Sequence, residues 1–308
     1  MMKKVVLASA SNNLKKGRPT PITVAIFILL IIYTVVLFTP IVWSIIASFM
    51  DNSDFNNFFG TLKAYDHGIK YTIDNFVYAW ENVTITSTTS TDSVFYIPDL
   101  LINSVLYSLG CASAFTICPV IVAYVTARFK YGFSKIVYAF VIVTMALPIV
   151  GSMASEIIML NNLGIFDTFP SVFILRFNFL SIYFLILHAQ FSSLPMDYTE
   201  AAKIDGASNL RIMFQVIIPQ SLNTIVTVFV LSFISYWNDY QIPLLYLPSY
   251  PTAAYGIFDF VVQNTAGEGA YVPTQLAATI IMTLPIIIVF IIVNKRIRVS
   301  VAMGGIKS

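Results

Sequence analysis

Long apolar runs alternate with short polar stretches along the whole chain. Six runs without a charged residue are each long enough to form the helix of roughly twenty residues that crosses a membrane. These runs are 19–50, 100–127, 136–155, 177–196, 212–238 and 269–294. A seventh uncharged run, 240–258, contains Pro243, Pro248 and Pro251, which interrupt the backbone hydrogen bonding that a lipid-exposed span requires. The pattern therefore predicts six membrane-spanning helices, with most of the seventh run in an external loop.

The composition points to the same class. Hydrophobic residues make up 57% of the chain and charged residues 10%, whereas about a quarter of an average soluble domain is charged. We therefore expect an all-α, polytopic membrane protein. No Walker A sequence, dinucleotide-binding turn or nucleophile elbow is present. The two cysteines and two histidines show no metal-ligand spacing, so we expect no catalytic residue, no metal and no cofactor in this subunit.

Basic residues are distributed unequally between the two sides that six alternating spans define. Fourteen of the 17 fall on the side of the N-terminus. They are Lys3, Lys4, Lys15, Lys16, Arg18, Arg128, Lys130, Lys135, Lys203, Arg211, Lys295, Arg296, Arg298 and Lys307. Because cytoplasmic loops are enriched in Lys and Arg, both termini are predicted to be cytoplasmic. The first run is too long for a cleaved signal peptide, so it is expected to remain as an anchor.

This topology divides the chain into three parts and several loops. A cytoplasmic segment, 1–21, precedes the membrane domain, 22–294, and a cytoplasmic tail, 295–308, follows it. The outer loops are 51–98, which could hold a short helix near Ile73 to Trp80, 161–171 and 248–273. The fourth and fifth spans are joined by a cytoplasmic loop over 195–220.

The loop 195–220 carries the most informative residues of the sequence. Asp197 and Glu200 have the spacing of a capping box, so a short helix is predicted to begin near Tyr198. Gly206 is able to end it in the left-handed conformation. Ser208 can cap a second helix, which carries apolar residues from Leu210 to Val216. The pattern predicts a helix–turn–helix on the membrane face, and an ordinary amphipathic loop is the alternative.

The same loop resembles the EAA loop of ABC importer permeases, by which the membrane subunit docks onto its ATPase. The matching residues are Glu200, Ala201, Ala202, Asp205, Gly206, Ala207 and Pro219. Val216 and Ile218 stand where the family pattern has Ile and Leu. The resemblance implies that these residues couple the subunit to an ATPase.

Further segments resemble the carbohydrate-type branch of that family, in particular its maltose-type second permease. They are Asn103-Ser104, Ala123-Tyr124, Ala127-Arg128-Phe129, Leu147-Pro148, Leu163 to Thr168, Trp237 to Leu244 and the tail Met303 to Ser308. The resemblance implies a type I ABC importer permease fold with cytoplasmic coupling helices. It also implies a second homologous permease subunit, two ATPase subunits that bind ATP and Mg, and an extracytoplasmic solute-binding protein. Membrane lipid would surround the assembly, in the cytoplasmic membrane of a bacterium or archaeon, and no nucleic acid is expected as a partner.

Polar residues near the end of the fifth run are candidates for the translocation pathway or a gate. Asp239 lies beside Asn238 and Gln241, and ionisable groups inside membranes usually face a bundle interior or an aqueous cavity. A structural network or a wetted interfacial position is the alternative. Glu156 and Arg176 are predicted to pair with each other. His188 and Gln190 are predicted to form hydrogen bonds between helices rather than to bind sugar.

The outer loop 248–273 has an apolar centre, from Ala253 to Val262, which is unusual for a solvated loop. In the family that the chain resembles, this loop enters the cleft of the binding protein. The resemblance therefore makes Tyr255, Phe258, Gln263 and Asn264 candidate contacts for that partner.

The function expected from these observations is ATP-driven import of a mono- or oligosaccharide. The same architecture could import another solute, such as a polyol or glycerol phosphate. An ion-coupled carrier or a channel is the competing class, and a partner ATPase distinguishes it. A membrane-embedded enzyme is disfavoured because the spans lack a constellation of His, Asp and Glu residues.

Overall fold

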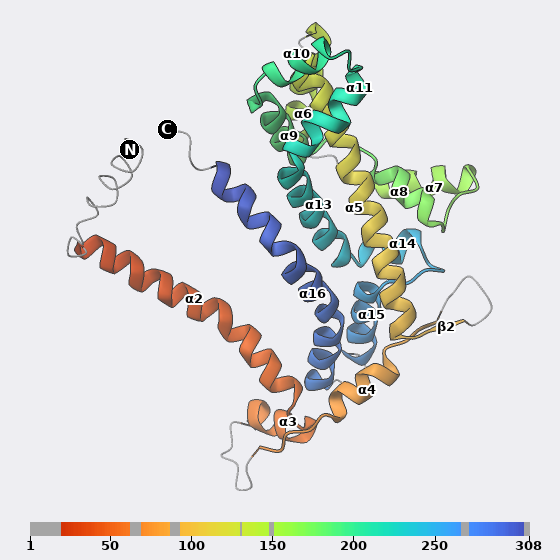
Figure 1. Cartoon of the computed structure of the whole chain (residues 1–308). Helices are drawn as coiled ribbons and strands as arrows, with labels where there is room; N and C mark the ends of the chain where they lie inside the picture. Colours follow the sequence, from red (N-terminus) through yellow and green to blue (C-terminus); the bar gives the residue numbers. More distant parts are fainter. Residues whose placement is uncertain are drawn as a thin grey trace.

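The computed structural model is almost entirely helical and describes residues 20–61, 69–86, 93–129, 131–147, 151–265 and 271–304. Figure 1 shows the helices as an elongated bundle, with α10 and α11 at one end and α3 and α4 at the other. We refer to these as the α10–α11 end and the α3–α4 end. The all-α membrane class predicted from the sequence is confirmed.

The first described helix, α2 (Pro21–Ser48), stands apart from the rest of the chain. Thr20 caps it by accepting a hydrogen bond from the Thr23 N–H, and Pro21 occupies its first turn. The hydroxyls of Thr34, Thr39 and Ser44 donate to carbonyls four residues earlier, so they need no partner outside the helix. In Figure 1, α2 diverges from α16 (Val272–Gly304) and approaches it only toward the α3–α4 end. Nearly all of its apolar surface is therefore left bare by its own chain.

Short elements close the α3–α4 end. They are α3 (Asn52–Thr61), α4 (Asp74–Asn82) and a hairpin of two-residue strands, β1 (Ile85–Thr86) and β2 (Val94–Phe95). The helix expected near Ile73 to Trp80 is thus confirmed as α4. Asn75, which is only 3% exposed, donates its amide to the carbonyls of Ser48 and Met50. It joins the end of α2 to α4.

The centre of the bundle is α5 (Ile97–Arg128), against which α9 (Ile182–Ser193) and α13 (Leu222–Trp237) pack. The remaining elements before α9 are α6 (Gly132–Ala146), α7 (Ser152–Asn162) and α8 (Phe169–Arg176). Gly110 of α5 lets α8 approach closely, because a Cβ at this position would overlap the ring of Phe173. After α9 come α10 (Asp197–Ile204), α11 (Asn209–Ile212), a π-helical turn η1 (Met213–Ile217) and α12 (Ile218–Gln220). Between α13 and α16 lie α14 (Gln241–Tyr246) and α15 (Ala253–Thr265).

Three of the described helices, α2, α5 and the part of α16 up to Ile292, are long and apolar enough to cross a membrane. A fourth span results if the segment Asn209–Gln220 and α13, which meet at a bend of 77°, are counted together. The helices α6 and α9 are apolar but shorter. With 12 residues, α9 is about 18 Å long, less than the hydrocarbon core of about 30 Å. The count of six spans stays a prediction.

Two expected spans are interrupted. The run 136–155 is not one helix, because α6 ends at Ala146 and Gly151 adopts a left-handed φ of 92° before α7 begins. The run 177–196 becomes helical only at Ile182, because the amide of Leu180 bonds to the Asn178 side chain in a turn after α8. An uncharged run establishes apolarity along its length, but not continuous backbone hydrogen bonding.

Candidate functional site

The short helix α10 ends as the position of Gly206 predicts. Gly206 has a φ of 76°, its N–H donates to the carbonyl of Lys203, and the Ala207 N–H donates to that of Ala202. These two bonds form a Schellman motif, which satisfies carbonyls at the end of the helix. The start of the helix differs from the expectation, because Met196 is the N-cap and no side chain caps it. The predicted capping box between Asp197 and Glu200 is therefore wrong, although the helix begins within one residue of the predicted position.

The arm after the turn is bound to the bundle. Ser208 caps α11 by accepting a hydrogen bond from the Arg211 N–H, as predicted. Ile212, Met213 and Ile217 are buried in a core shared with α5 and α9. The continuous helix expected from Leu210 to Val216 is instead α11 followed by the π-helical turn. Pro219 has no N–H to donate to an α-helical ladder here, which is a usual reason for such a local adjustment.

Arg128, the last residue of α5, holds the arm that leads into α10. Its guanidinium donates to the carbonyl of Leu194 at 3.0 Å and to that of Pro195 at 3.4 Å, and contacts the Met196 sulfur at 3.1 Å. The sequence analysis counted Arg128 only as a basic residue and as part of a family segment. Its position directly at the end of an apolar run is the signal that could have suggested an anchoring role.

The tip of the loop exposes large apolar side chains. Ile204 is 87% exposed, Leu210 68% and Phe214 59%. They lie close in sequence to the exposed side chains of Glu200, Ala201 and Asp205, while Ala202 and Ala207 are half-buried against the core. A polar segment that exposes such residues forms a surface suited to another protein.

Asp239 lies in the connection between α13 and α14. One carboxylate oxygen accepts the N–H groups of Gln241 and Ile242 at 3.1 and 3.2 Å, and the other accepts the hydroxyl of Tyr107 at 2.8 Å. Asp239 therefore caps α14 and ties it to α5. Asn238 and Gln241 are exposed beside it, and the Asn238 amide donates to the Ile234 carbonyl.

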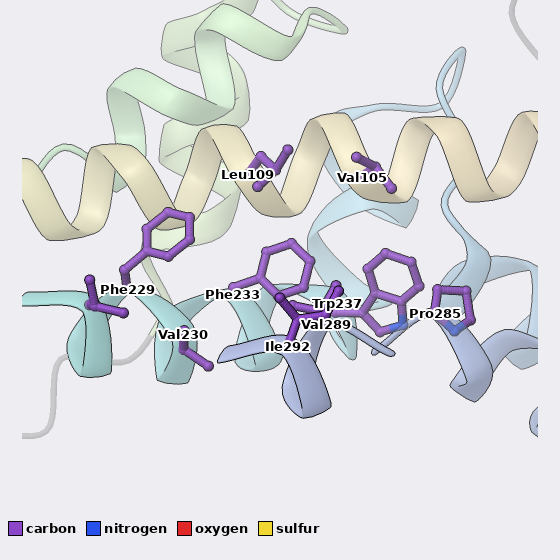
Figure 2. A pocket seen from close by; sticks show the side chains of 10 residues that line it. Val105, Leu109, Phe229, Val230, Phe233, Trp237, Pro285, Val289 and Ile292 are labelled. Carbon is purple, nitrogen blue, oxygen red and sulfur yellow. The ribbon is translucent and has the colours of Figure 1, made fainter. Parts of the chain in front are cut away.

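The two sides of α13 border different grooves. An apolar groove of about 530 Å³ lies between α5, α13 and α16. Figure 2 shows the side chains that line it. Its lining comprises Val105, Leu109, Val226, Phe229, Val230, Phe233, Trp237, Pro285, Val289 and Ile292. A second groove, of about 510 Å³, lies between α9 and α13 and contains hydroxyl and amide groups.

Comparison with known proteins decides the family. Residues 116–301, more than half of the chain, match the family described as binding-protein-dependent transport system inner membrane component. The chain belongs to this family of transport permeases. The diacetylchitobiose uptake system permease protein of Streptomyces coelicolor is 24% identical over 90% of this chain and 86% of that protein. The trehalose/maltose transport system permease protein of Thermococcus litoralis is 24% identical over 90% and 94%.

The fold agrees with this family. One chain of a bacterial ABC transporter involved in the import of the acidic polysaccharide alginate superimposes with a TM-score of 0.70 at 20% identity, over 91% of this chain and 98% of that chain. The permease therefore has the fold of an ABC importer membrane subunit, and it is a membrane component of a transport system rather than an enzyme. The resemblance inferred from the loop 195–220 is confirmed.

Other polar residues of the permease have partners that differ from those expected. Glu156 accepts a hydrogen bond from the Tyr246 hydroxyl at 2.8 Å, and no ion pair joins it to Arg176 within the described ranges. His188 packs against Tyr138, with ring centroids 4.7 Å apart, and interacts with the backbone of Thr126. His188 thus contacts α6 through its ring, and its expected hydrogen bond between helices stays a prediction. The side chain of Gln190 instead borders the groove between α9 and α13.

The apolar centre of the segment 248–273 is a packed helix rather than an exposed loop. Ala253 and Phe260 of α15 are buried in a core with α4, α5 and α16. The apolar pattern is therefore explained by packing, and the reading of this stretch as unusually exposed is wrong. Tyr255 is half-buried, whereas Phe258 stacks on Tyr240 with centroids 4.3 Å apart. Gln263 and Asn264 belong to α15, but their side chains lie outside the described part of the structure.

Asn103 and Ser104 of α5 fix the start of α15. The Asn103 amide donates to the carbonyl of Pro251 at 3.0 Å, and the Ser104 hydroxyl accepts the N–H of Ala253 at 2.6 Å. These residues carried part of the family resemblance, but nothing in the sequence pattern indicated their partners, which lie almost 150 residues away.

Proposed function

We propose that the permease imports a sugar as one membrane subunit of an ABC transporter. It would act with a second homologous permease, two ATPase subunits that bind ATP and Mg, and a solute-binding protein. Sugar as the substrate class is supported by the names of several relatives, among them transport proteins for diacetylchitobiose, trehalose/maltose and galactooligosaccharides. The family description supports the need for a binding protein.

The orientation follows from the distribution of charge. From the α3–α4 end, the N-terminal end of α2 and the C-terminal end of α16 both point toward the side on which α10 and α11 lie (Figure 1). Seven basic residues belong to described segments near this end, so we place it in the cytoplasm. They are Arg128, Lys135, Lys203, Arg211, Lys295, Arg296 and Arg298. The α3–α4 end then faces the binding protein, with Phe258 of α15 among the candidate contacts.

The observation that carries the proposal is the tip of the loop 195–220. Ile204 is exposed, as are its sequence neighbours Glu200, Ala201 and Asp205. Arg128 and the buried arm after Gly206 connect this tip to the bundle. A partner that contacts Ile204, Leu210 and Phe214 would bury apolar surface that the chain alone leaves in water. Movement of an ATPase would thereby reach α5 and α9, whose side chains form one core with the loop.

The test measures ATP hydrolysis by the ATPase subunits in a complex reconstituted with the permease pair and the binding protein. Ile204→Ser and Leu210→Ser together should abolish the stimulation of hydrolysis by the binding protein. Phe133→Ser is the control, because Phe133 is 73% exposed, a value between those of Leu210 and Ile204, but belongs to α6. Full stimulation in the loop variant would contradict the coupling role. Uptake that continues without any ATPase subunit would favour the ion-coupled carrier instead.

A further inference from the structure

Three charged side chains accompany the apolar core that joins α5, α7, α8, α13 and α14. They are Glu156 of α7, Arg176 at the end of α8 and Asp239 between α13 and α14. Each carboxylate accepts a hydrogen bond from a tyrosine hydroxyl of this core, Tyr246 for Glu156 and Tyr107 for Asp239, both at 2.8 Å. The two acids are thus held by neutral partners, although a cation lies near them.

The guanidinium of Arg176 is left without such a partner. Its Nε atom is shielded from solvent and forms no hydrogen bond with any described residue. A buried donor without an acceptor costs free energy, and the cost is greater for a charged group. The described conformation therefore leaves one strong interaction of Arg176 unmade.

The surroundings of Arg176 favour Asp239 as the missing acceptor. The charge of Arg176 acts on the side chains of Tyr107, Cys111 and Tyr236, and the charge of Asp239 acts on the same three. Glu156 shares one such neighbour with Arg176, the hydroxyl that it accepts. Because electrostatic interactions weaken with distance, three shared neighbours favour Asp239 over Glu156.

Asp239 can change partners without losing its place. Its Oδ1 atom accepts the N–H groups of Gln241 and Ile242 and so caps α14, whereas its Oδ2 atom accepts only the Tyr107 hydroxyl among the described residues. A bond to Arg176 requires only that the second interaction break. A guanidinium adds the attraction of opposite charges to the hydrogen bond, which a tyrosine hydroxyl lacks.

We propose that Arg176 and Asp239 form an ion pair in one nucleotide state of the transport cycle, and that Tyr107 holds Asp239 in the other. The structure describes the state with the tyrosine bond. The exchange would draw the end of α8 toward the connection between α13 and α14, which gives these elements two discrete arrangements. Arg176 is then a positioning residue that sets the balance between them. This inference rests on the proposed function, because ATP drives the alternation.

The test measures the separation of α8 and α14 in the complete transporter with its ATPase, companion permease and binding protein. Spin labels are attached to Ile174→Cys of α8 and Leu245→Cys of α14, both exposed, with Cys111 and Cys118 replaced by alanine. Pulsed electron paramagnetic resonance records the distances without nucleotide and with ATP in the absence of Mg, which prevents hydrolysis. We expect two distances whose populations differ between the two states.

Two variants should shift these populations in opposite directions. Arg176→Gln removes the ion pair and should deplete the paired arrangement by about fivefold or more, whereas Tyr107→Phe removes the competing donor and should enrich it. In an Asp239→Asn background, Arg176→Gln should have no further effect. In a Glu156→Gln background, which is the matched control, its effect should persist. The reverse dependence would assign the pair to Glu156 and overturn the exchange at Asp239.

Two other results would overturn the exchange altogether. They are equal distances in both nucleotide states, and shifts in the same direction for Arg176→Gln and Tyr107→Phe. ATP hydrolysis stimulated by the binding protein is measured on the same preparations. Stimulated hydrolysis with equal distances defeats this inference alone, whereas hydrolysis that the binding protein does not stimulate in the unmodified transporter contradicts the proposed function.

Discussion

The two ends of the permease are held together by different interactions. At the α3–α4 end, side chains bond to backbone groups of distant segments, as Asn75 does to Ser48 and Met50 and Asn103 does to Pro251. At the α10–α11 end, the loop is held mainly by an apolar core. Two side chains of α5 add hydrogen bonds to its backbone: the Arg128 guanidinium bonds to Leu194 and Pro195, and the Tyr124 hydroxyl donates to the Asn209 carbonyl at 3.5 Å. Hydrogen bonds fix direction as well as distance, whereas apolar contacts are not directional. The first end is thus built as a fixed frame, and the second allows small displacements.

The largest effect is expected from Asn75→Leu, which breaks the fixed end. The substitution removes both donated bonds and leaves the carbonyls of Ser48 and Met50 without them, which should lower the free energy of unfolding by about 3 kcal/mol. Thermal unfolding in detergent measures this loss. Asn82→Leu is the control, because Asn82 is exposed and, among the described residues, its amide bonds only to Tyr78 of its own helix. Equal losses for both variants would contradict the role of Asn75.

Arg128→Met tests the other end. The variant keeps the apolar stem but loses the bonds to Leu194 and Pro195, at a local cost of about 2 kcal/mol. Amide hydrogen exchange over α10 should accelerate while that over α4 stays unchanged. Arg211→Met is the matched control, because Gln215, one helical turn away, is the only described residue to which the Arg211 side chain bonds. Unaltered exchange over α10 in Arg128→Met would show that the apolar core alone holds the loop.

Gly206→Val sharpens the comparison of the two ends, because it strains the turn at the α10–α11 end without removing a contact. No atom lies within 4 Å of a Cβ at this position, so the penalty comes from the left-handed φ of 76° and should be about 1–2 kcal/mol. Stimulated ATP hydrolysis should fall with Val and be largely retained with Gly206→Asn, because asparagine tolerates this conformation. If Asn and Val impair hydrolysis equally, the backbone conformation of Gly206 is not the cause.

The smallest effect is expected from Asp239→Asn. Asparagine caps helices about as well as aspartate, so the loss of stability should stay below about 1 kcal/mol, whereas Asp239→Leu removes both the cap of α14 and the acceptor for Tyr107. A double-mutant cycle that combines Asp239→Leu with Tyr107→Phe, measured by thermal unfolding, isolates the interaction between the Asp239 and Tyr107 side chains. A coupling of zero would separate Asp239 from this structural link and return it to the pathway candidates.

The sequence predicted the class, the family and the turn at Gly206, because composition and short-range spacing determine them. It missed the break near Gly151, the burial of Phe260 and the partners of Asn103 and Ser104. Apolarity alone does not distinguish a continuous span from an interrupted one. It also does not show whether an apolar segment such as α15 is buried against other helices. The bonds from Asn103 and Ser104 depend on tertiary structure. The coupling, pathway and binding-protein roles of the candidate residues stay predictions.

The isolation of α2 has a consequence for how the permease is made. Its polar side chains bond within the helix, so α2 is stable in lipid as soon as it has been synthesised, before any other described helix exists. The later helix α13 buries the Ser232 hydroxyl without a hydrogen-bond partner among the described residues, and its burial depends on neighbouring helices. Among the described helices, the first to be inserted is therefore one that is stable in lipid without contacts to the rest of the chain. The helices that depend on tertiary contacts are synthesised later, when their partners are already in the membrane.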